Sequence, residues 1–360
     1  MSLALRNVSL RIDAATHIYE TSVELAPRGF NILLGTTLAG KTTLLRLMAG
    51  LLKPTRGAIL FNGKDVTQVP VRERRVAMVY QQFINYGHLS VFENIASPLH
   101  VAGVRAAEIT TRVARIAEIL RLSALLDRKP AELSGGQQQR TALARALVKD
   151  ADLVLLDEPL ANLDYKLRED LRDELPRLFA DRECTVVYAT TEPAEAMLLS
   201  GHTATLFEGR VTQLGPTEAV YRQPIDLTTA RVFSDPPINT AQVIKSGASV
   251  RLGDSVQWPA EGPLASLPDG PYTLGLRPHH VQPVNGGNLP DGVTIEGRVS
   301  IAELSGSESV IHFDLLGQTW VSQSHGVRGF KVGTVAPFRL DVRRSLYFTA
   351  AGRRVRAASL

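Results

Sequence analysis

The chain is 360 residues long, with 40 Lys and Arg residues against 36 Asp and Glu residues and a formal net charge of +4. This balance argues against a dedicated nucleic-acid binder, which concentrates basic residues on one face. Cys184 is the only cysteine, which excludes an intrachain disulfide and a cysteine-rich metal site. The sequence shows neither a secretory signal nor about 18 consecutive apolar residues, so we expect a cytosolic chain with no membrane-spanning segment.

The first 200 residues alternate strand-like and helix-like segments. Residues 30–34 form a short apolar run that ends at a glycine, and a helical pattern starts near Lys41. Residues 88–150 carry apolar side chains mostly at helical spacing, which predicts a helical subdomain. Strand-like runs return at 153–156 and 185–188. Alternating strands and helices predict an α/β fold with a largely parallel sheet.

The last third of the chain has a different character. Residues 224–239 are polar and interrupted by prolines. The residues that follow form short strand-like runs separated by Gly, Pro and Asp turns, which predicts an all-β domain. The predicted domains are therefore residues 1–235 and residues 236–360.

A glycine-flanked loop between the strand at 30–34 and the next helix fits the pattern G-x-x-x-x-G-K-[ST]. Its backbone N–H groups and the helix N-terminus direct positive dipole ends at phosphates. Lys41 is predicted to bind the β- and γ-phosphates of a nucleotide, and Thr42 to ligate Mg²⁺. The candidate nucleotide-binding residues of this P-loop are Gly35, Thr36, Thr37, Leu38, Ala39, Gly40, Lys41, Thr42 and Thr43.

An apolar run at residues 153–156 ends in the pair Asp157 and Glu158. A buried strand would place Asp157 beside the Mg²⁺, and Glu158 would orient or deprotonate the attacking water. Taken alone, the pair could also be a helix N-cap. The P-loop upstream favours the catalytic interpretation.

A second anion-binding helix N-terminus is predicted at Ser134, Gly135, Gly136 and Gln137. Two phosphate-binding helix ends far apart in one sequence are best explained by head-to-tail pairing of two subunits. Each nucleotide would then lie between the P-loop of one subunit and the Ser-Gly-Gly segment of the other.

These three motifs together resemble the ATP-binding-cassette ATPase family. The resemblance implies an ATP- and Mg²⁺-dependent ATPase with a P-loop core and a helical subdomain. It also implies a second ATPase subunit, two transmembrane permease subunits and, indirectly, a periplasmic solute-binding protein. The implied location is the cytoplasmic face of the bacterial inner membrane.

The family resemblance assigns Gln81 to a loop that touches Mg²⁺ and the attacking water and senses the membrane subunit. It places residues 83–91 near that subunit. An alternative is that Phe83, Tyr86 and Phe92 belong to the core of the helical subdomain. The aromatic that stacks on adenine is not evident, and plain strand positions are the preferred interpretation of Tyr19 and His17.

The tail, through residues 275–280 and 299–313, resembles the OB-like regulatory β-domain of ATPases from maltose-type importers. Residues 80–86 and 189–193 resemble one of the two unlike ATPase subunits of a bacterial glycerol importer. The implied function is ATP-driven import of a small polyol or sugar, glycerol in particular. The alternatives are a homodimeric ATPase of a sugar or glycerol-3-phosphate importer, and a regulatory subunit with weak hydrolysis.

One departure from the family pattern bears on catalysis. Thr191 stands where the family carries a switch histidine, and a threonine hydroxyl reaches less far and carries no charge. His202 is a weak candidate to replace it. Ala161 stands where a serine commonly begins the segment Asn162-Leu163-Asp164. We therefore expect altered γ-phosphate sensing and a mixed ATPase pair in which the other subunit keeps its histidine.

A cytosolic ATPase of the DNA-repair or structural-maintenance class is the alternative from another functional class. Such proteins interrupt the ATPase with long coiled coils. Lys41 and Asp157 lie only 116 residues apart here, and no sustained heptads separate them. The spacing therefore favours an importer ATPase.

Overall fold

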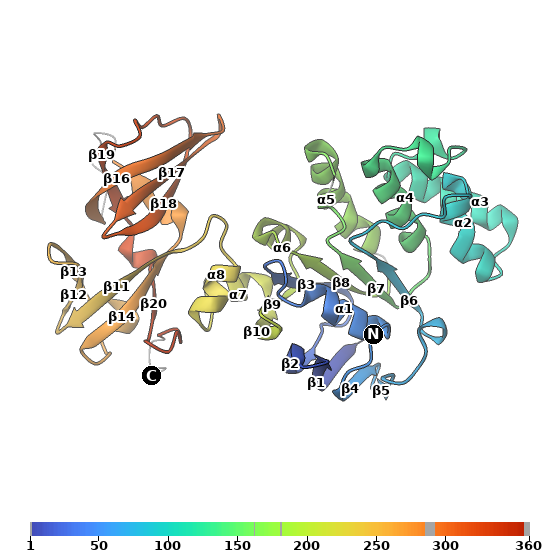
Figure 1. Cartoon of the computed structure of the whole chain (residues 1–360), viewed down its shortest axis with the longest axis horizontal. Coiled ribbons are helices and arrows are strands. Elements are labelled where there is room, and N and C mark those ends of the chain that lie inside the picture. Colours follow the sequence, from blue (N-terminus) through green and yellow to red (C-terminus); the bar gives the residue numbers. More distant parts are fainter. Residues whose placement is uncertain (1, 162, 181, 285–291, 356–360) are drawn as a thin grey trace. The chain divides into compact units, whose positions relative to one another are not determined.

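The computed structural model describes residues 2–161, 163–180, 182–284 and 292–355. The chain divides into two compact units, residues 1–220 and residues 221–360 (Figure 1). Among the described residues, no helix is long and apolar enough to cross a membrane.

The first unit is built on a six-stranded sheet with the order β10-β9-β3-β8-β7-β6. Neighbouring strands from β9 to β6 are parallel, and β10 pairs antiparallel with β9. These strands are β3 (Gly29–Gly35), β6 (Val76–Val79), β7 (Leu153–Asp157), β8 (Thr185–Thr190), β9 (His202–Phe207) and β10 (Arg210–Pro216). Strands β7 and β8 are buried along their whole length, as expected for parallel strands covered on both faces. The predicted α/β fold is confirmed.

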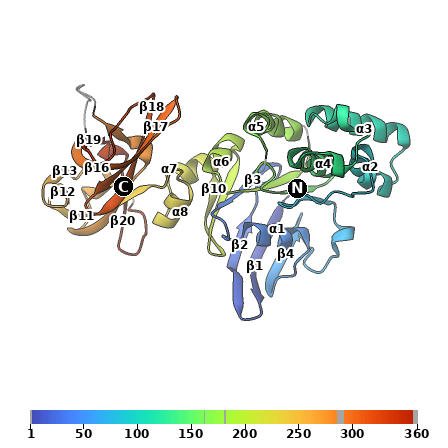
Figure 2. The ribbon, with the colours of Figure 1, turned by 45° about the horizontal axis from the view of Figure 1, so that its top comes forward.

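A second, antiparallel sheet of the first unit has the order β2-β1-β4-β5. It consists of β1 (Leu3–Ile12), β2 (Ala15–Glu24), β4 (Arg56–Phe61) and β5 (Lys64–Asp65). Helix α1 (Lys41–Ala49) lies between the two sheets (Figure 2) and contributes Leu44, Leu45, Leu47 and Met48 to the core that both sheets share. Burial on several sides therefore fixes the position of α1 and of the loop that precedes it.

The predicted helical subdomain contains α2 (Val91–Val101), α3 (Ala106–Ile119) and α4 (Gly135–Leu147), joined by the short 3₁₀ turns η2 (Ser123–Leu125) and η3 (Pro130–Glu132). The three long helices lie at one end of the first unit (Figure 1). Helices α2 and α4 each begin with a capping box, formed by Ser90 with Glu93 and by Ser134 with Gln137. Two further helices, α5 (Tyr165–Ala180) and α6 (Pro193–Leu199), follow β7 and β8. The helical subdomain is confirmed.

The second unit contains two five-stranded antiparallel sheets, with the orders β13-β12-β11-β14-β20 and β15-β19-β16-β17-β18. Their inner faces share one core that includes Trp258, Phe313, Trp320 and Phe338. The strands are β11 (Asn239–Ser246), β12 (Ser249–Leu252), β13 (Val256–Pro259), β14 (Gly270–Leu276), β15 (Val281–Pro283), β16 (Val293–Leu304), β17 (Glu308–Leu315), β18 (Gln318–His325), β19 (Val335–Leu340) and β20 (Leu346–Phe348). This architecture confirms the predicted β-rich C-terminal domain.

The sequence predicted a domain boundary between residues 235 and 236, whereas the compact units divide between Val220 and Tyr221. Two short helices, α7 (Thr217–Arg222) and α8 (Leu227–Val232), lie near this division. The rings of Tyr221 and Phe233 meet edge to face with centroids 5.4 Å apart. Arg277 lies 3.7 Å from the centroid of the Tyr221 ring and donates hydrogen bonds to the carbonyls of Phe233 (2.8 Å) and Tyr221 (2.6 Å). We propose that residues 221–234 fold with the β-domain.

This proposal predicts how two truncated chains will behave. Both a chain ending at Val220 and a chain ending at Ser234 should fold and bind ATP. Phe233 is fully buried in the full chain, and the chain ending at Ser234 keeps Phe233 but lacks the β-domain. Exposing such a side chain to water costs about 1.5–3 kcal/mol. It should therefore aggregate more readily.

The measurement is a thermal melt of both chains with and without ATP, because a bound ligand at 100 times its Kd stabilises a protein by about 2.7 kcal/mol. A chain ending at Ser234 that is stabilised by ATP, beside an insoluble chain ending at Val220, would assign residues 221–234 to the first unit.

Candidate active site

The turn from β3 into α1 requires glycine at two positions. A Cβ atom on Gly35 would lie 2.6 Å from the carbonyl oxygen of Leu206 and 2.8 Å from the Cβ of Ala39. Gly40 has a φ of 101°, in the region that favours glycine, and it is the N-cap of α1. Because Gly40 has no side chain, the first N–H groups of α1 stay available at the loop. The turn therefore presents backbone donors suited to an anion.

Lys41 is the first residue of α1 and is only 4% exposed. Its Nζ donates to the carbonyl oxygens of Gly35 (3.0 Å) and Thr36 (3.1 Å) and lies 3.2 Å from Oε1 of Glu158. A buried ammonium group needs such partners, because an unpaired charge in the interior is costly. The loop thus holds a positive charge beside its free N–H groups.

Thr42 and Asp157 form an oxygen-rich pair next to Lys41. Asp157 is the last residue of β7, is 1% exposed, and accepts a 3.0 Å hydrogen bond from the Thr42 hydroxyl. Burial raises the pKa of Asp157, and the hydrogen bond from Thr42 opposes this rise. A hydroxyl and a carboxylate are ligands that Mg²⁺ prefers, so the pair fits this cation. Among the described residues, no group of three or more His, Cys, Asp or Glu gathers as an alternative metal site.

Glu158 lies where several loops meet. Its backbone has a φ of 47°, which is uncommon for a residue with a side chain, and its N–H donates to the carbonyl of Ala189 at 3.0 Å. The carboxylate contacts Lys41 through one oxygen and accepts a 3.1 Å hydrogen bond from Nε2 of Gln81 through the other. The structure therefore joins Gln81, 77 residues earlier in the chain, to Glu158.

Thr191 follows the last residue of β8, and β8 lies between β3 and β7 in the sheet. The carboxyl ends of parallel strands meet at one edge, so Thr191 lies at the same edge as the P-loop and Glu158. Its side chain is exposed, whereas the hydroxyl of Thr190 is buried and bonds Glu195 at 2.6 Å. The exposed hydroxyl of Thr191 is thus available to a ligand at this edge.

The structure disfavours His202 as a replacement for the missing histidine. His202 is the first residue of β9 and pairs with Asn31, whereas Gly35 at the other end of β3 pairs with Leu206. Four residues of strand separate His202 from the P-loop edge, which is about 13 Å. His202 therefore lies at the opposite edge of the sheet from Thr191.

The segment of Ser134, Gly135, Gly136 and Gln137 lies at the start of α4, in the helical subdomain. The Ser134 side chain accepts a hydrogen bond from the N–H of Gln137, whose own side chain accepts from the N–H of Ser134 at 2.9 Å. Ser134 and Gly135 are exposed, and a Cβ on Gly135 would meet nothing within 4 Å. Within the described chain, no hydrogen bond or ion pair joins this segment to Lys41 or Glu158. This segment therefore lies apart from the cluster of Lys41 and Glu158.

Tyr19 and His17 both lie on β2. The guanidinium of Arg210 covers the Tyr19 ring at 3.6 Å from its centroid. Tyr86 is exposed, and Arg145 lies over its ring at 4.7 Å, so Tyr86 is not part of the subdomain core. Phe83 and Phe92 are partly buried, and their assignment to the subdomain core stays a prediction. Asn162 lies outside the described residues.

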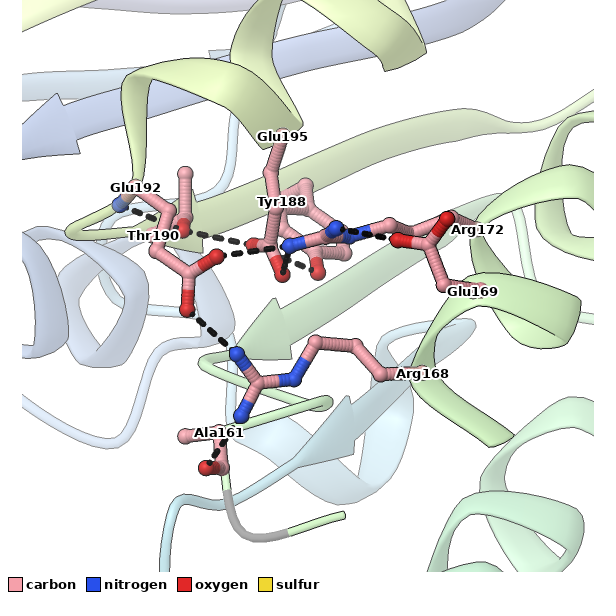
Figure 3. Close-up of polar contacts among 8 residues, drawn as sticks. All are labelled: Ala161, Arg168, Glu169, Arg172, Tyr188, Thr190, Glu192 and Glu195. Atoms are coloured by element: carbon pink, nitrogen blue, oxygen red, sulfur yellow. Dashed lines mark hydrogen bonds and ion pairs between the residues drawn. The ribbon is translucent and has the colours of Figure 1, made fainter. Parts of the chain in front are cut away.

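Sequence reasoning missed a network of charged side chains around Glu192, shown in Figure 3. It joins Arg168 and Arg172 of α5 to Glu192 and Glu195 near the start of α6. The spacing of four residues between the arginines and three between the glutamates was the available signal. That signal is common on solvated helices, so only the fold shows that the two helices face one another here.

The fold and the converging P-loop, Asp157 and Glu158 define a P-loop ATPase. A family model described as "ABC transporter" matches residues 19–161. The chain is 38% identical over 303 residues to the maltose/maltodextrin import ATP-binding protein of Yersinia pestis, covering 82% of this chain and 81% of that protein. It is 35% identical over 367 residues to the sn-glycerol-3-phosphate import ATP-binding protein of Cupriavidus necator, covering 99% of both. The chain belongs to the ATPases of ABC transporters.

A solved structure adds support for the fold of the first unit. It is a dimeric ATP-binding cassette in a post-hydrolysis state, bound to ADP and phosphate. It matches with a TM-score of 0.55 and 26% identity, over 60% of this chain and 98% of that one. The ATPase core thus accounts for the shared fold, and the β-domain lies beyond it.

Proposed function

We propose that the chain energises the import of a small polyol or sugar, glycerol in particular, by hydrolysing ATP at the cytoplasmic face of a bacterial inner membrane. It would act with a second ATPase subunit, two transmembrane permease subunits and a periplasmic solute-binding protein. The observation that carries the proposal is the convergence of Lys41, Asp157, Glu158 and Gln81 at one sheet edge. The similarity to import ATP-binding proteins over most of the chain supports the transport role.

The P-loop would bind the phosphates through its backbone N–H groups and Lys41. Thr42 and Asp157 would hold the Mg²⁺, which supplies neutralising charge at the phosphate oxygens. Lys41 now contacts two loop carbonyls and Glu158, so it must exchange these partners for phosphate oxygens when nucleotide binds. That exchange would release Glu158 to accept a hydrogen bond from the attacking water. Gln81 already touches Glu158 and would orient the same water.

A groove of about 780 Å³ supports a membrane-subunit contact near residues 83–91. It is lined in part by Tyr80, Tyr86, Val101 and Arg145. Tyr86 is 46% exposed and Ile84 is 61% exposed, so both apolar surfaces are available for contact with another subunit. Because the groove adjoins the segment that follows Gln81, an occupant could transmit its position to Glu158.

The missing histidine supports a mixed ATPase pair. Two copies of this chain would form two sites that both have Thr191, and each would lack one charged contact to the γ-phosphate. A different subunit that keeps its histidine would form one fast site, completed by Ser134, Gly135 and Gly136 of this chain. The pair would then have unequal sites.

Purification of the complex through a tag on the permease, with identification of every chain, tests the assembly. The expected result is this chain with one unlike ATPase, and ATP hydrolysis that rises when the solute-binding protein carries glycerol. Two copies of this chain would point to a homodimeric importer, and stimulation only by sugar or glycerol 3-phosphate would replace glycerol as the solute. No copurifying permease would overturn the transport role.

Lys41→Ala should weaken nucleotide binding itself. Hydrogen bonds to a charged group contribute about 1.5–3 kcal/mol, so the Kd for ATP should rise roughly 10- to 150-fold. Equilibrium titration of the purified chain measures this change. Lys53→Ala, which removes an exposed lysine just beyond α1, is the matched control and should leave the Kd unchanged. An unaltered Kd in Lys41→Ala would remove Lys41 from the phosphate site.

A further inference from the structure

Glu192 connects two arginines that the proposed chemistry does not use (Figure 3). Its Oε1 lies 2.8 Å from a guanidinium nitrogen of Arg168, and its Oε2 lies 2.6 Å from one of Arg172. Glu192 precedes α6 and directly follows Thr191, whereas both arginines lie on α5. The side chain of Arg168 is 25% exposed and that of Glu192 is 35% exposed. Pairs withdrawn from solvent in this way are screened less than surface pairs.

Hydrogen bonds also fix the residue that precedes Thr191. Glu195 is buried and accepts hydrogen bonds from the hydroxyls of Tyr188 (3.0 Å) and Thr190 (2.6 Å). The Thr190 hydroxyl in turn accepts from the N–H of Glu192 at 3.0 Å. Residues on both sides of Thr191 are therefore fixed, and Thr191 itself keeps an exposed side chain.

Arg168 also reaches the loop that carries the catalytic carboxylate. Its second terminal nitrogen donates to the carbonyl of Ala161 at 3.1 Å, and the N–H of Ala161 donates to the carbonyl of Glu158 at 3.3 Å. One guanidinium thus bridges the carboxylate of Glu192 and the backbone just after Glu158. In Figure 3, Arg168 extends from α5 between Glu192 and Ala161.

We propose that Glu192 is a positioning residue that, through Arg168, couples the loop of Thr191 to the loop of Glu158. The short threonine hydroxyl can contact a phosphate only over a narrow range of loop positions, so its loop must be held tightly relative to the catalytic carboxylate. The proposal rests on the proposed roles of Thr191 and Glu158 in hydrolysis. The coupling between the loops can be measured without hydrolysis.

Hydrogen exchange on the full chain tests the coupling directly. Glu192→Gln keeps the size of the side chain but removes its charge, so Arg168 loses its ion pair. Amide exchange in residues 158–161 should rise several-fold, although this segment is about 30 residues away in sequence. The matched control is Glu174→Gln. It removes the ion-pair partner of the exposed Arg177, and both residues lie on α5, as Arg168 does. Exchange in residues 158–161 that matches wild type in Glu192→Gln would overturn the proposal.

Kinetics then test the positioning role. In Glu192→Gln, the kcat of this chain's own site, measured in single turnover, should fall about tenfold with KM unchanged, because phosphate binding by Lys41 is untouched. Glu192→Asp keeps the charge and should restore part of the loss. Arg168→Gln should lower kcat similarly, and the double variant should lose little more, since both changes break one connection.

Additive losses from the two changes, or a fall in binding with kcat intact, would contradict the positioning role. A wild-type complex that does not hydrolyse ATP would refute the proposed function instead. In that case the exchange experiment alone would still decide whether the two loops are coupled.

Discussion

Glu158→Gln is expected to slow single-turnover ATP hydrolysis at this chain's own site by on the order of 10²–10⁴-fold, the usual contribution of a general base. Gln keeps the size of the side chain but cannot accept a proton. ATP binding should be retained, because the change also removes the carboxylate that now lies 3.2 Å from Nζ of Lys41 and competes with phosphate.

Rapid-quench measurement of product, beside equilibrium titration of ATP, checks this result. Glu208→Gln is a matched control, since Glu208 has a φ of 46° close to the 47° of Glu158 but lies in the turn between β9 and β10. It should hydrolyse ATP at the wild-type rate. Single-turnover hydrolysis near the wild-type rate in Glu158→Gln would remove Glu158 from its catalytic role.

Ser134→Arg should abolish most ATP hydrolysis by the assembled complex, and Glu158→Gln should reduce it less. The reason is the proposed inequality of the two sites. Loss of one positioned transition-state contact costs on the order of 10²–10³-fold in rate, so the site with Thr191 contributes little turnover. The partner's site carries the turnover and needs Ser134 of this chain. An arginine at this exposed helix start would block the nucleotide there.

Ser134→Ala is the control, because it removes the helix cap without adding a side chain that blocks the nucleotide. Removal of the Ser134 cap costs roughly 1 kcal/mol of stability, and a thermal melt detects this loss in both variants. Hydrolysis should be lower in Ser134→Arg than in Ser134→Ala. Equal and complete loss from Ser134→Arg and Glu158→Gln would refute unequal sites and favour a symmetric pair that tolerates threonine.

The parts of the site that neighbouring residues encode could be predicted from the amino-acid sequence. The P-loop was evident because its residues form one contiguous pattern. The structure shows the reason for the two glycines: a Cβ has no room at Gly35, and Gly40 has a φ of 101°. Asp157 and Glu158 were evident because they follow an apolar strand that the sheet buries. The α/β core and the β-rich tail were likewise predicted from periodicity, since strands and helices place apolar residues at different spacings.

Contacts between segments that are distant in sequence became evident only in the folded chain. Strand order and register placed His202 at the opposite edge of the sheet from Thr191, joined Gln81 to Glu158, and brought α5 against α6 so that Arg168 reaches Glu192. The fold likewise brought Arg277 to the carbonyls of Phe233 and Tyr221, more than 40 residues earlier in the chain. Such contacts depend on which strands pair and which faces pack, and no local run of residues encodes that choice.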